Sequence, residues 1–225
     1  MRSYYKLNDR FLVSVDCVIF GINEGKLSIL LIKRRFEPER GKWSLMGGFV
    51  RQDESVDQAA KRVLTELTGM MDVYMEQVGA FGDVKRDPGD RVISIAYFAL
   101  LKIDEHDRER VKEHNAQWVS IDEIPPLGFD HPLMIAKARE MMKRKVPYYP
   151  IGFNLLPEYF TLTQLQSLYE TILEEPIDKR NFRKRIAEMN CVEKTELIDK
   201  SSSKRGASLY RFNQDIYNQQ LKFRL

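Results

Sequence analysis

The sequence has few residues of the kinds that build disulfide or metal scaffolds. Its 225 residues include only two cysteines and three histidines. Cys17 and Cys191 lie far apart in apolar surroundings, and neither belongs to a C-x-x-C or Cys/His ligand pattern. We interpret both as buried free thiols in a reducing compartment. The sequence therefore predicts no metal site and no bound cofactor, and it excludes a disulfide-stapled secreted domain.

Long apolar runs are also missing. No stretch approaches the length of a membrane span, and the first ten residues, MRSYYKLNDR, lack the apolar core of a signal peptide. We therefore expect a soluble cytoplasmic protein that does not bind a membrane. The net charge is only +3, so the distribution of charge along the chain is more informative than its sum. The length allows one or two domains with a sizeable core.

The first 145 residues predict a mixed sheet with flanking helices, an α/β (α+β) architecture. Two segments have helical periodicity, 55–68 and 130–145. Ser55 and Gln58 form a capping-box pattern before the first, and Asp130 is placed to cap the second. The β-branched and aliphatic runs that predict strands are 11–21, 26–34, 42–50, 73–84, 91–103 and 114–125.

The pattern changes after residue 145. Residues 146–157 contain three prolines and predict a linker between a domain of residues 1–145 and one of residues 158–225. In the second domain, Thr161 and Gln164 form another capping box before an apolar helical stripe, and Asp178 caps a second helix. Two short extended runs around a Gly/Ser-rich loop follow. This order of helix, tight turn, helix and hairpin is typical of a winged helix-turn-helix.

The segment GGFVRQDESVDQAAKRVLTELTGM carries the most specific motif of the chain. Its spacing resembles the Nudix box, G-x5-E-x7-R-E-U-x-E-E-x-G-U, in which U is apolar. The flanking segment KWSLMGGFV also resembles this family, with Met46 where proline is usual. The resemblance implies a Nudix α/β/α sandwich. The residues that match the box are Gly48, Glu54, Arg62, Leu64, Glu66, Gly69 and Met70.

The same box lacks the chemistry of the Nudix hydrolases. That family uses closely spaced glutamates on one helix face to hold Mg²⁺ against a diphosphate. The three positions here are Val63, Glu66 and Leu67. Mg²⁺ requires oxygen ligands, which Val and Leu do not offer. We therefore predict no catalytic residues, with Glu54, Arg62 and Glu66 as remnants and the first two as a structural ion pair. Hydrolysis of a nucleoside diphosphate derivative is the alternative.

Positive charge gathers on the second helix and the hairpin tip of the second domain. Arg and Asn read base edges in the major groove, and Lys and Arg also contact phosphates. The alternative is a solvated basic helix on a small appendage. The residues predicted to bind double-stranded DNA are Lys179, Arg180, Asn181, Arg183, Lys184 and Arg185 on the helix and Lys200, Lys204 and Arg205 at the hairpin tip.

A Nudix domain followed by a winged helix resembles the Nudix-related transcriptional regulators. The segments FTLTQLQSLYETIL and DKRNFRKRI are similar to the C-terminal domain of that family. The resemblance implies a homodimer that binds a palindromic operator at the nucleoid and senses a small effector. We predict a repressor of sugar catabolism that responds to L-arabinose. The alternatives are a regulator of NAD metabolism that senses ADP-ribose, and an inactive scaffold that binds protein or RNA.

A sugar effector would need aromatic stacking and hydrogen bonds rather than a metal. Ordinary core packing and surface charge would explain the same residues. The predicted effector-binding residues are Trp43, Phe49 and Phe81 for stacking and Arg35, Asp83 and Arg91 for hydrogen bonding.

Overall fold

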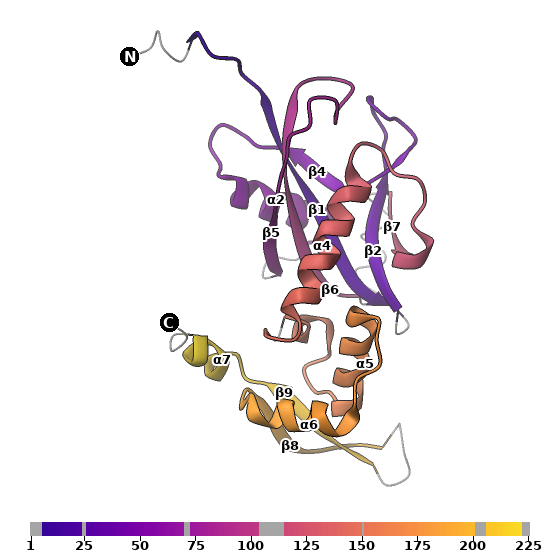
Figure 1. Cartoon of the computed structure of the whole chain (residues 1–225), viewed down its shortest axis with the longest axis vertical. Coiled ribbons are helices and arrows are strands. Elements are labelled where there is room, and N and C mark those ends of the chain that lie inside the picture. Colours follow the sequence, from indigo (N-terminus) through magenta and orange to yellow (C-terminus); the bar gives the residue numbers. More distant parts are fainter. Residues whose placement is uncertain are drawn as a thin grey trace.

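A computed structural model describes residues 6–23, 26–69, 73–103, 115–149, 151–200 and 206–221. A sheet with two long helices forms one part, and a smaller part made of helices and a hairpin lies beyond the end of helix α4 (Figure 1). Among these residues, no helix is both long and apolar enough to cross a membrane.

The first part is built on a seven-stranded mixed sheet. The strand order is β3-β2-β1-β6-β5, with β4 also paired to β1 and β7 to β2. Strands β1 and β6 run parallel, and the other pairs are antiparallel. The strands are β1 (Leu12–Asn23), β2 (Lys26–Lys33), β3 (Trp43–Ser44), β4 (Met46–Phe49), β5 (Tyr74–Phe81), β6 (Val92–Lys102) and β7 (Ala116–Ser120).

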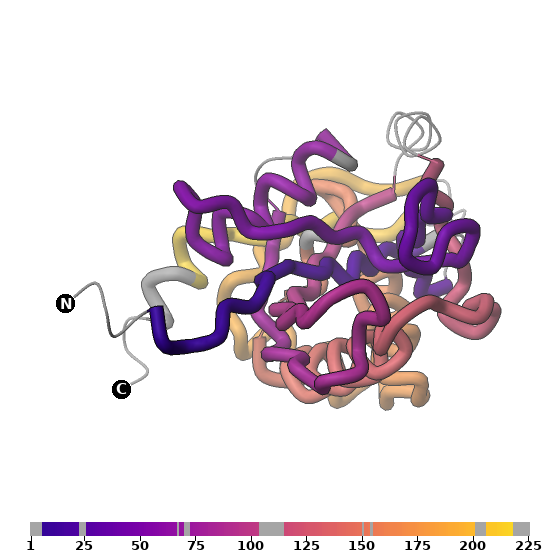
Figure 2. Tube along the Cα trace, turned by 90° about the horizontal axis from the view of Figure 1, so that it is seen from above, coloured from indigo at the N-terminus to yellow at the C-terminus, as the bar shows by residue number. Residues whose placement is uncertain are grey.

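Helices α2 (Val56–Thr68) and α4 (His131–Lys145) cover opposite faces of this sheet. Successive side chains of β1 point to opposite faces, as in any strand. Cys17 therefore packs with Val63 of α2, whereas Val18 packs with Met134 of α4. Seen from above, α2 and α4 lie on either side of the strands (Figure 2). The predicted α/β/α sandwich is confirmed.

The predicted caps explain where the helices begin and end. Gln58 N donates to Ser55 Oγ at 3.2 Å and Ser55 N donates to Gln58 Oε1 at 2.7 Å, while Gly69 ends α2 with φ 74°. Glycine adopts such a positive φ without steric cost. Asp130 precedes α4 as expected, but its carboxylate makes no cap hydrogen bond and binds Arg86 instead.

The second part is a winged helix-turn-helix, as predicted. Thr161 and Gln164 form the second capping box, and Asp178 Oδ1 accepts from Asn181 N at 2.8 Å. The order of its elements is α5 (Leu162–Leu173), α6 (Lys179–Glu188), β8 (Val192–Asp199), β9 (Ala207–Phe212) and α7 (Gln214–Leu221). Strands β8 and β9 form the antiparallel wing, and α7 was not predicted.

The segment between the two parts is packed rather than extended into solvent. Phe153, in the short 3-10 helix η2 (Phe153–Leu155), is buried and its ring stacks on Phe212 of β9 at a centroid distance of 4.3 Å. Ile151 and Leu155 are also buried. These side chains belong to one apolar core that includes α4 and α5. The winged helix is therefore held against the sandwich by a continuous core.

Candidate functional site

A compact ion cluster holds the end of β4 and the loop that follows it, residues 50–55, to α2. Arg62 Nε and Nη2 donate to the two carboxylate oxygens of Glu54 at 2.9 and 2.6 Å, and Nη2 also donates to Phe49 O at 3.1 Å. Arg62 Nη1 lies 3.5 Å from Glu66 Oε2, and Arg51 Nη2 lies 3.7 Å from Glu66 Oε1. The predicted Glu54–Arg62 pair is therefore present in the structure, and it fixes the loop to the helix through both a side chain and a carbonyl.

The pKa of Glu54 reflects this arrangement. Hydrogen bonds from the Arg62 guanidinium, and then from the Arg51 backbone, lower the pKa of Glu54 to about 2. The same partner raises the pKa of Arg62 above its usual value. The contact therefore favours the charged form of both groups.

The face of α2 that carries metal ligands in Nudix hydrolases is apolar in this chain. Val63 is 2% exposed and packs against Gly48, where an added Cβ would lie 3.1 Å from Val63 Cγ2. Leu67 is part of α2, but its side chain lies outside the described residues. Within those residues, no three Asp, Glu, His or Cys side chains converge as metal ligands. This donor set does not fit Mg²⁺, because Glu66 alone of the three ligand positions carries a carboxylate and it is already paired with Arg51 and Arg62. Glu54, the other carboxylate of the box, is bound by Arg62.

A buried charge network on the opposite face of the sheet was missed by sequence reasoning. Asp16 accepts from Ser94 Oγ at 2.5 Å and lies 3.5 Å from Arg86 Nη2 and 3.6 Å from His131 Nε2. Arg86 also binds Asp130 with Nε and Nη2. The network ties the loop of residues 82–91 to the start of α4. Asp16 within an otherwise apolar strand was its one visible signal.

The pKa of Asp16 follows from several opposing causes. Burial alone would raise it, but the hydrogen bond and charge of His131, the Ser94 hydroxyl and the Arg86 charge together keep the pKa below its ordinary value. The side chain also abuts Gly47, where a Cβ would lie 2.3 Å from Asp16 Oδ1. Gly47, the residue before the first glycine of the box, is therefore required by this close approach.

The structure divides the six predicted effector residues into three settings. Phe49 is 56% exposed and shares a row across the sheet with Phe81, through Ser14 and Ser94. Phe81 itself is buried in the core on the α4 side, so its ring is not open to a ligand in this structure. Its predicted stacking role therefore does not match its position.

Asp83 and Arg91 meet in the loop that follows Phe81. Arg91 donates to Gly82 O at 3.1 Å and to Asp83 O at 3.3 Å, and its guanidinium lies over the Phe11 ring. Leu12 N donates to Arg91 O and Val50 N to Val13 O, which places this loop and the strand of Phe49 on either side of β1.

Arg35 and Trp43 belong to a different edge of the sheet. Arg35 is exposed after β2, and Trp43 is half-buried in β3. Trp43 and Trp118 line a cavity of about 480 Å³ beside β2 and β7. Asp83 and Arg91 therefore share one loop, and Phe49 lies at the same end of the sheet with β1 between them. Trp43 lies at the opposite edge, whereas the loop that follows Arg35 approaches the loop of Asp83 and Arg91, since a Cβ on Gly89 would lie 3.3 Å from Pro38 Cγ.

The basic helix α6 presents two different polar faces. Phe182 and Ile186 are its buried residues. Residues three, four or seven positions apart share a helix face. The first polar face contains Arg180 and Arg183, which are exposed and suited to contact DNA. The second contains Asn181, Arg185 and Glu188, which border a cavity toward the end of α4. Lys184 lies between the two faces: it is exposed, it also lines the cavity, and it pairs with Glu188.

The remaining residues predicted to bind DNA flank this helix. Lys179 begins α6 and is exposed, and Lys200 directly follows β8 at the tip end of the wing and is also exposed. Lys204 and Arg205 lie outside the described residues. Gly206 precedes β9 with φ 73°, which supports the expected tight turn at this end of the wing.

Comparisons with known proteins agree with both halves of this architecture. Residues 10–143 match the family model described as NUDIX domain, and residues 152–212 match the one described as NrtR DNA-binding winged helix domain. The two matches coincide with the sandwich and with the winged helix of Figure 1.

Similar proteins have been described under names that include a function. The chain is 37% identical over 211 residues to the ADPR responsive transcriptional repressor NtrR of Acinetobacter baylyi, over 92% of this chain and 84% of that protein. The crystal structure of Shewanella oneidensis NrtR complexed with a 27mer DNA superposes with a TM-score of 0.83 at 31% identity, covering 92% and 95% of the two chains.

A second structure of the Shewanella protein bears on the effector. The NUDIX domain of Shewanella oneidensis NrtR complexed with ADP ribose superposes with a TM-score of 0.51 at 28% identity, over 63% of this chain and 98% of that domain. The Acinetobacter protein is named as ADPR responsive and the Shewanella domain was crystallised with ADP ribose, whereas neither description mentions arabinose. The predicted L-arabinose effector and role in sugar catabolism are therefore not supported.

Proposed function

Because this chain belongs to the NrtR-type family of Nudix transcriptional regulators, we propose that it is a DNA-binding repressor whose Nudix domain responds to ADP-ribose. The observation that carries the proposal is the 37% identity to an ADPR-responsive repressor over 92% of this chain. The proposal replaces arabinose with ADP-ribose and sugar catabolism with NAD metabolism, and it places the action of the protein on chromosomal DNA in the cytoplasm.

The candidate effector site is the end of the sheet that carries Phe49 on β4 and, across β1, Asp83 and Arg91 in the loop after β5. An ADP-ribose molecule offers an adenine ring, a diphosphate and ribose hydroxyls. In the proposed site the exposed Phe49 ring stacks on adenine, Arg91 binds the diphosphate, and Asp83 accepts from a hydroxyl. These roles need no metal. This agrees with the box of this chain, in which the buried Val63 occupies one ligand position and Arg62 neutralises Glu66 at another.

The DNA site is the exposed face of α6 together with the wing. In a homodimer, two such helices would enter successive major grooves of a palindromic operator, about 10 bp apart. Arg180 and Arg183 lie on the face that is free to enter the groove. Lys200, at the tip end of the wing, is proposed to contact the phosphate backbone.

Helix α4 is the physical connection between the two sites. Asp130, which immediately precedes this helix, holds the loop of residues 82–91 through Arg86, whose Nη2 lies 2.8 Å from Asp130 Oδ1. The last turns of α4 carry Arg139 and Lys143, and both pair with Glu174 at the end of α5. An effector that moves the loop therefore acts on a helix that is attached to the DNA-binding domain.

Such an effector must bind the two geometries unequally. A tenfold loss of DNA affinity requires ADP-ribose to bind the DNA-incompetent geometry about tenfold, or 1.4 kcal/mol, more tightly than the competent one. By linkage, DNA must then weaken ADP-ribose binding by the same factor.

The test begins with selection of a preferred duplex from a random pool by the full-length protein. Fluorescence anisotropy then measures its affinity with and without ADP-ribose, and with L-arabinose at the same concentrations. We expect ADP-ribose to release the duplex and L-arabinose to have no effect. Failure to retain any preferred duplex would overturn the proposed regulator.

A second measurement tests the absence of hydrolase activity. The protein is incubated with ADP-ribose and Mg²⁺, and AMP is quantified. We expect no turnover, whereas even about 1 s⁻¹ would fall within the range of ordinary enzymes and contradict the proposal.

A further inference from the structure

A cavity of about 620 Å³ lies between helix α6 and the end of α4. This volume is within the range of about 300–1,000 Å³ that is usual for small-molecule sites. Its walls come from the winged helix, and Val146 and Pro147 at the end of α4 close it from the Nudix side. It is separate from the effector site proposed above, because none of Phe49, Asp83 and Arg91 lines it.

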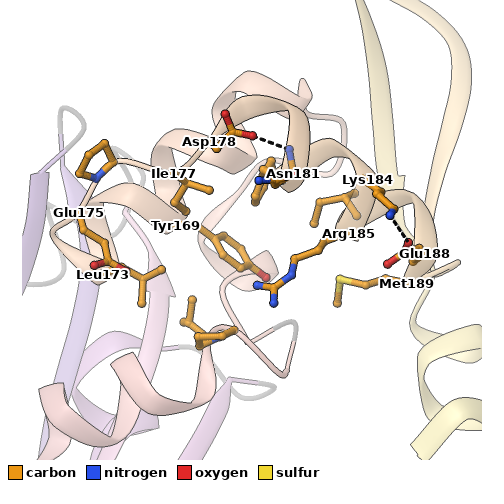
Figure 3. Close-up of a pocket in the computed structure, with 15 residues that line it drawn as sticks. Tyr169, Leu173, Glu175, Ile177, Asp178, Asn181, Lys184, Arg185, Glu188 and Met189 are labelled. Carbon is orange, nitrogen blue, oxygen red and sulfur yellow. Dashed lines mark hydrogen bonds and ion pairs between the residues drawn. The ribbon is translucent and has the colours of Figure 1, made fainter.

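The cavity contains a buried hydroxyl that lacks a partner. Tyr169 is 6% exposed, and among the described residues its Oη has no hydrogen-bond partner. Burying a hydroxyl without a partner costs free energy, so such a group calls for a physical explanation. The ring is fixed by an edge-on contact with Phe182 at a centroid distance of 5.6 Å. Figure 3 shows Tyr169 extended into the cavity.

Arg185 supplies a cation to the same space. Figure 3 shows its side chain directed into the cavity alongside Tyr169. Among the described residues it has no carboxylate within ion-pair distance, whereas its neighbour Lys184 pairs with Glu188 at 4.0 Å. Arg185 lies on the flank of α6 that faces α4 rather than on the face of Arg183, so its charge is directed to the cavity.

The rest of the lining determines which anion would fit. Leu173, Phe182, Ile186 and Met189 provide apolar walls on which a flat ring can pack. A guanidinium binds a carboxylate in bidentate fashion, and the Tyr169 hydroxyl can donate to the same group. The charged residues of the lining are two cations, Lys184 and Arg185, and three carboxylates, Glu175, Asp178 and Glu188. Because the carboxylates outnumber the cations, they oppose a doubly charged phosphate more strongly than a single carboxylate.

The geometry points to a second ligand site, in which an aromatic monocarboxylate packs its ring against the apolar walls and places its carboxylate between Arg185 and Tyr169. This site does not depend on the ADP-ribose proposal. A ligand there would contact α6 and the end of α4 at the same time.

The probe is 2-naphthoate, titrated into the full-length protein without DNA or ADP-ribose and followed by its fluorescence. The uncharged 2-naphthamide is titrated in parallel. We expect saturable binding of one naphthoate per chain and binding of the amide that is weaker by about tenfold or more, because a charge-assisted hydrogen bond is lost.

Three variants locate the site. Arg185→Met should weaken naphthoate binding by about tenfold or more, and Tyr169→Phe by about threefold to tenfold. Tyr169→Phe keeps the ring and removes an unpartnered hydroxyl, so it is expected to fold. Arg183→Met, on the other polar face of the same helix, should leave the affinity within about twofold.

Absence of saturable binding up to millimolar naphthoate would overturn the inference. Equal binding of the acid and the amide, or affinities unchanged by both Arg185→Met and Tyr169→Phe, would also overturn it. None of these results bears on the anisotropy experiment with DNA and ADP-ribose, so the two proposals fail separately.

Discussion

Lys143 Nζ lies 2.6 Å from Glu174 Oε2, so the last turns of α4 are ion-paired to the residue that ends α5. Arg139 pairs with the other carboxylate oxygen. Glu174 holds this position because its backbone caps α5 with φ 59° and donates to Glu170 O at 2.8 Å. One carboxylate of the DNA-binding domain therefore receives two cations from the Nudix domain.

The first prediction is that Glu174→Gln weakens the effect of ADP-ribose on DNA affinity while the free energy of unfolding changes little. These side chains are 30–41% exposed, so removing the charge should cost less than about 1 kcal/mol of stability. We expect the coupling between effector and DNA to change by about 0.5–2 kcal/mol. The measurement is DNA affinity with and without saturating ADP-ribose.

Glu140→Gln is the matched control. Glu140 lies on the same helix, and within the described part of the chain its one ion-pair partner is Arg144, also in α4. It should leave the ADP-ribose response unchanged. If Glu174→Gln and Glu140→Gln show the same response as the unchanged protein, α4 does not couple the two sites through this contact.

The second prediction concerns Arg183 on the exposed face of α6. Arg183→Ala should weaken binding to the selected duplex by about 1–3 kcal/mol if the side chain reads a base. If it contacts phosphate instead, binding to all duplexes should weaken equally and the salt dependence should fall by about one ion. Anisotropy titrations at several salt concentrations, with selected and scrambled duplexes, distinguish the two cases.

Glu188→Gln provides the comparison on the other polar face. Removing a negative charge from the cavity flank should not weaken DNA binding. A loss equal to that of Arg183→Ala would mean that the cavity flank, rather than the exposed face, is presented to DNA.

The elements of the fold could be predicted because their signals are local. Capping boxes at Ser55 and Thr161 and apolar periodicity gave helix starts within one residue of those observed. Helix α7 was missed because its eight residues are mostly polar and form no apolar stripe. Its one local signal was Asn213, whose Oδ1 accepts from Asp215 N and Ile216 N at 3.1 Å.

The sites were harder to predict because their partners are distant in sequence. Glu54 and Arg62 are eight residues apart and could be paired from the motif. Arg86 lies 70 residues from Asp16 and 44 from Asp130, so no local pattern connects them. The separation of Arg183 from Arg185 could have been predicted, because Phe182 and Ile186 fix which face of α6 is buried.

The third prediction tests the buried network. Arg86 is 7% exposed, and Arg86→Met would leave the carboxylates of Asp16 and Asp130 without their shared cation. Breaking a buried ion pair by removing one partner typically costs about 3–5 kcal/mol. We expect a loss of this size in urea-induced unfolding.

Lys85→Met controls for the loss of a positive charge in the same loop. Lys85 is exposed, and its backbone, not its side chain, bonds to Asp83. Its effect should stay within about 0.5 kcal/mol. A loss below about 1 kcal/mol for Arg86→Met would show that the network does not stabilise the loop against α4.

The fourth prediction concerns acid stability and Glu54. Its pKa is lowered to about 2 by hydrogen bonds from Arg62 and from the Arg51 backbone, whereas a glutamate in an unfolded chain titrates near 4.3. A group whose pKa is depressed on folding stabilises the protein above the unfolded pKa, and that stabilisation is lost as pH falls through the folded pKa. Glu54 should therefore stabilise the protein fully above about pH 5 and progressively less toward pH 2.

Glu54→Gln should be less stable than the unchanged protein at pH 7, and the difference should narrow below about pH 4. Thermal unfolding of both proteins from pH 7 to pH 3 measures this gap, and other carboxylates, including Asp16, affect both proteins alike. A gap that stays constant or widens on acidification would show that the Glu54–Arg62 contact does not fix the loop in solution.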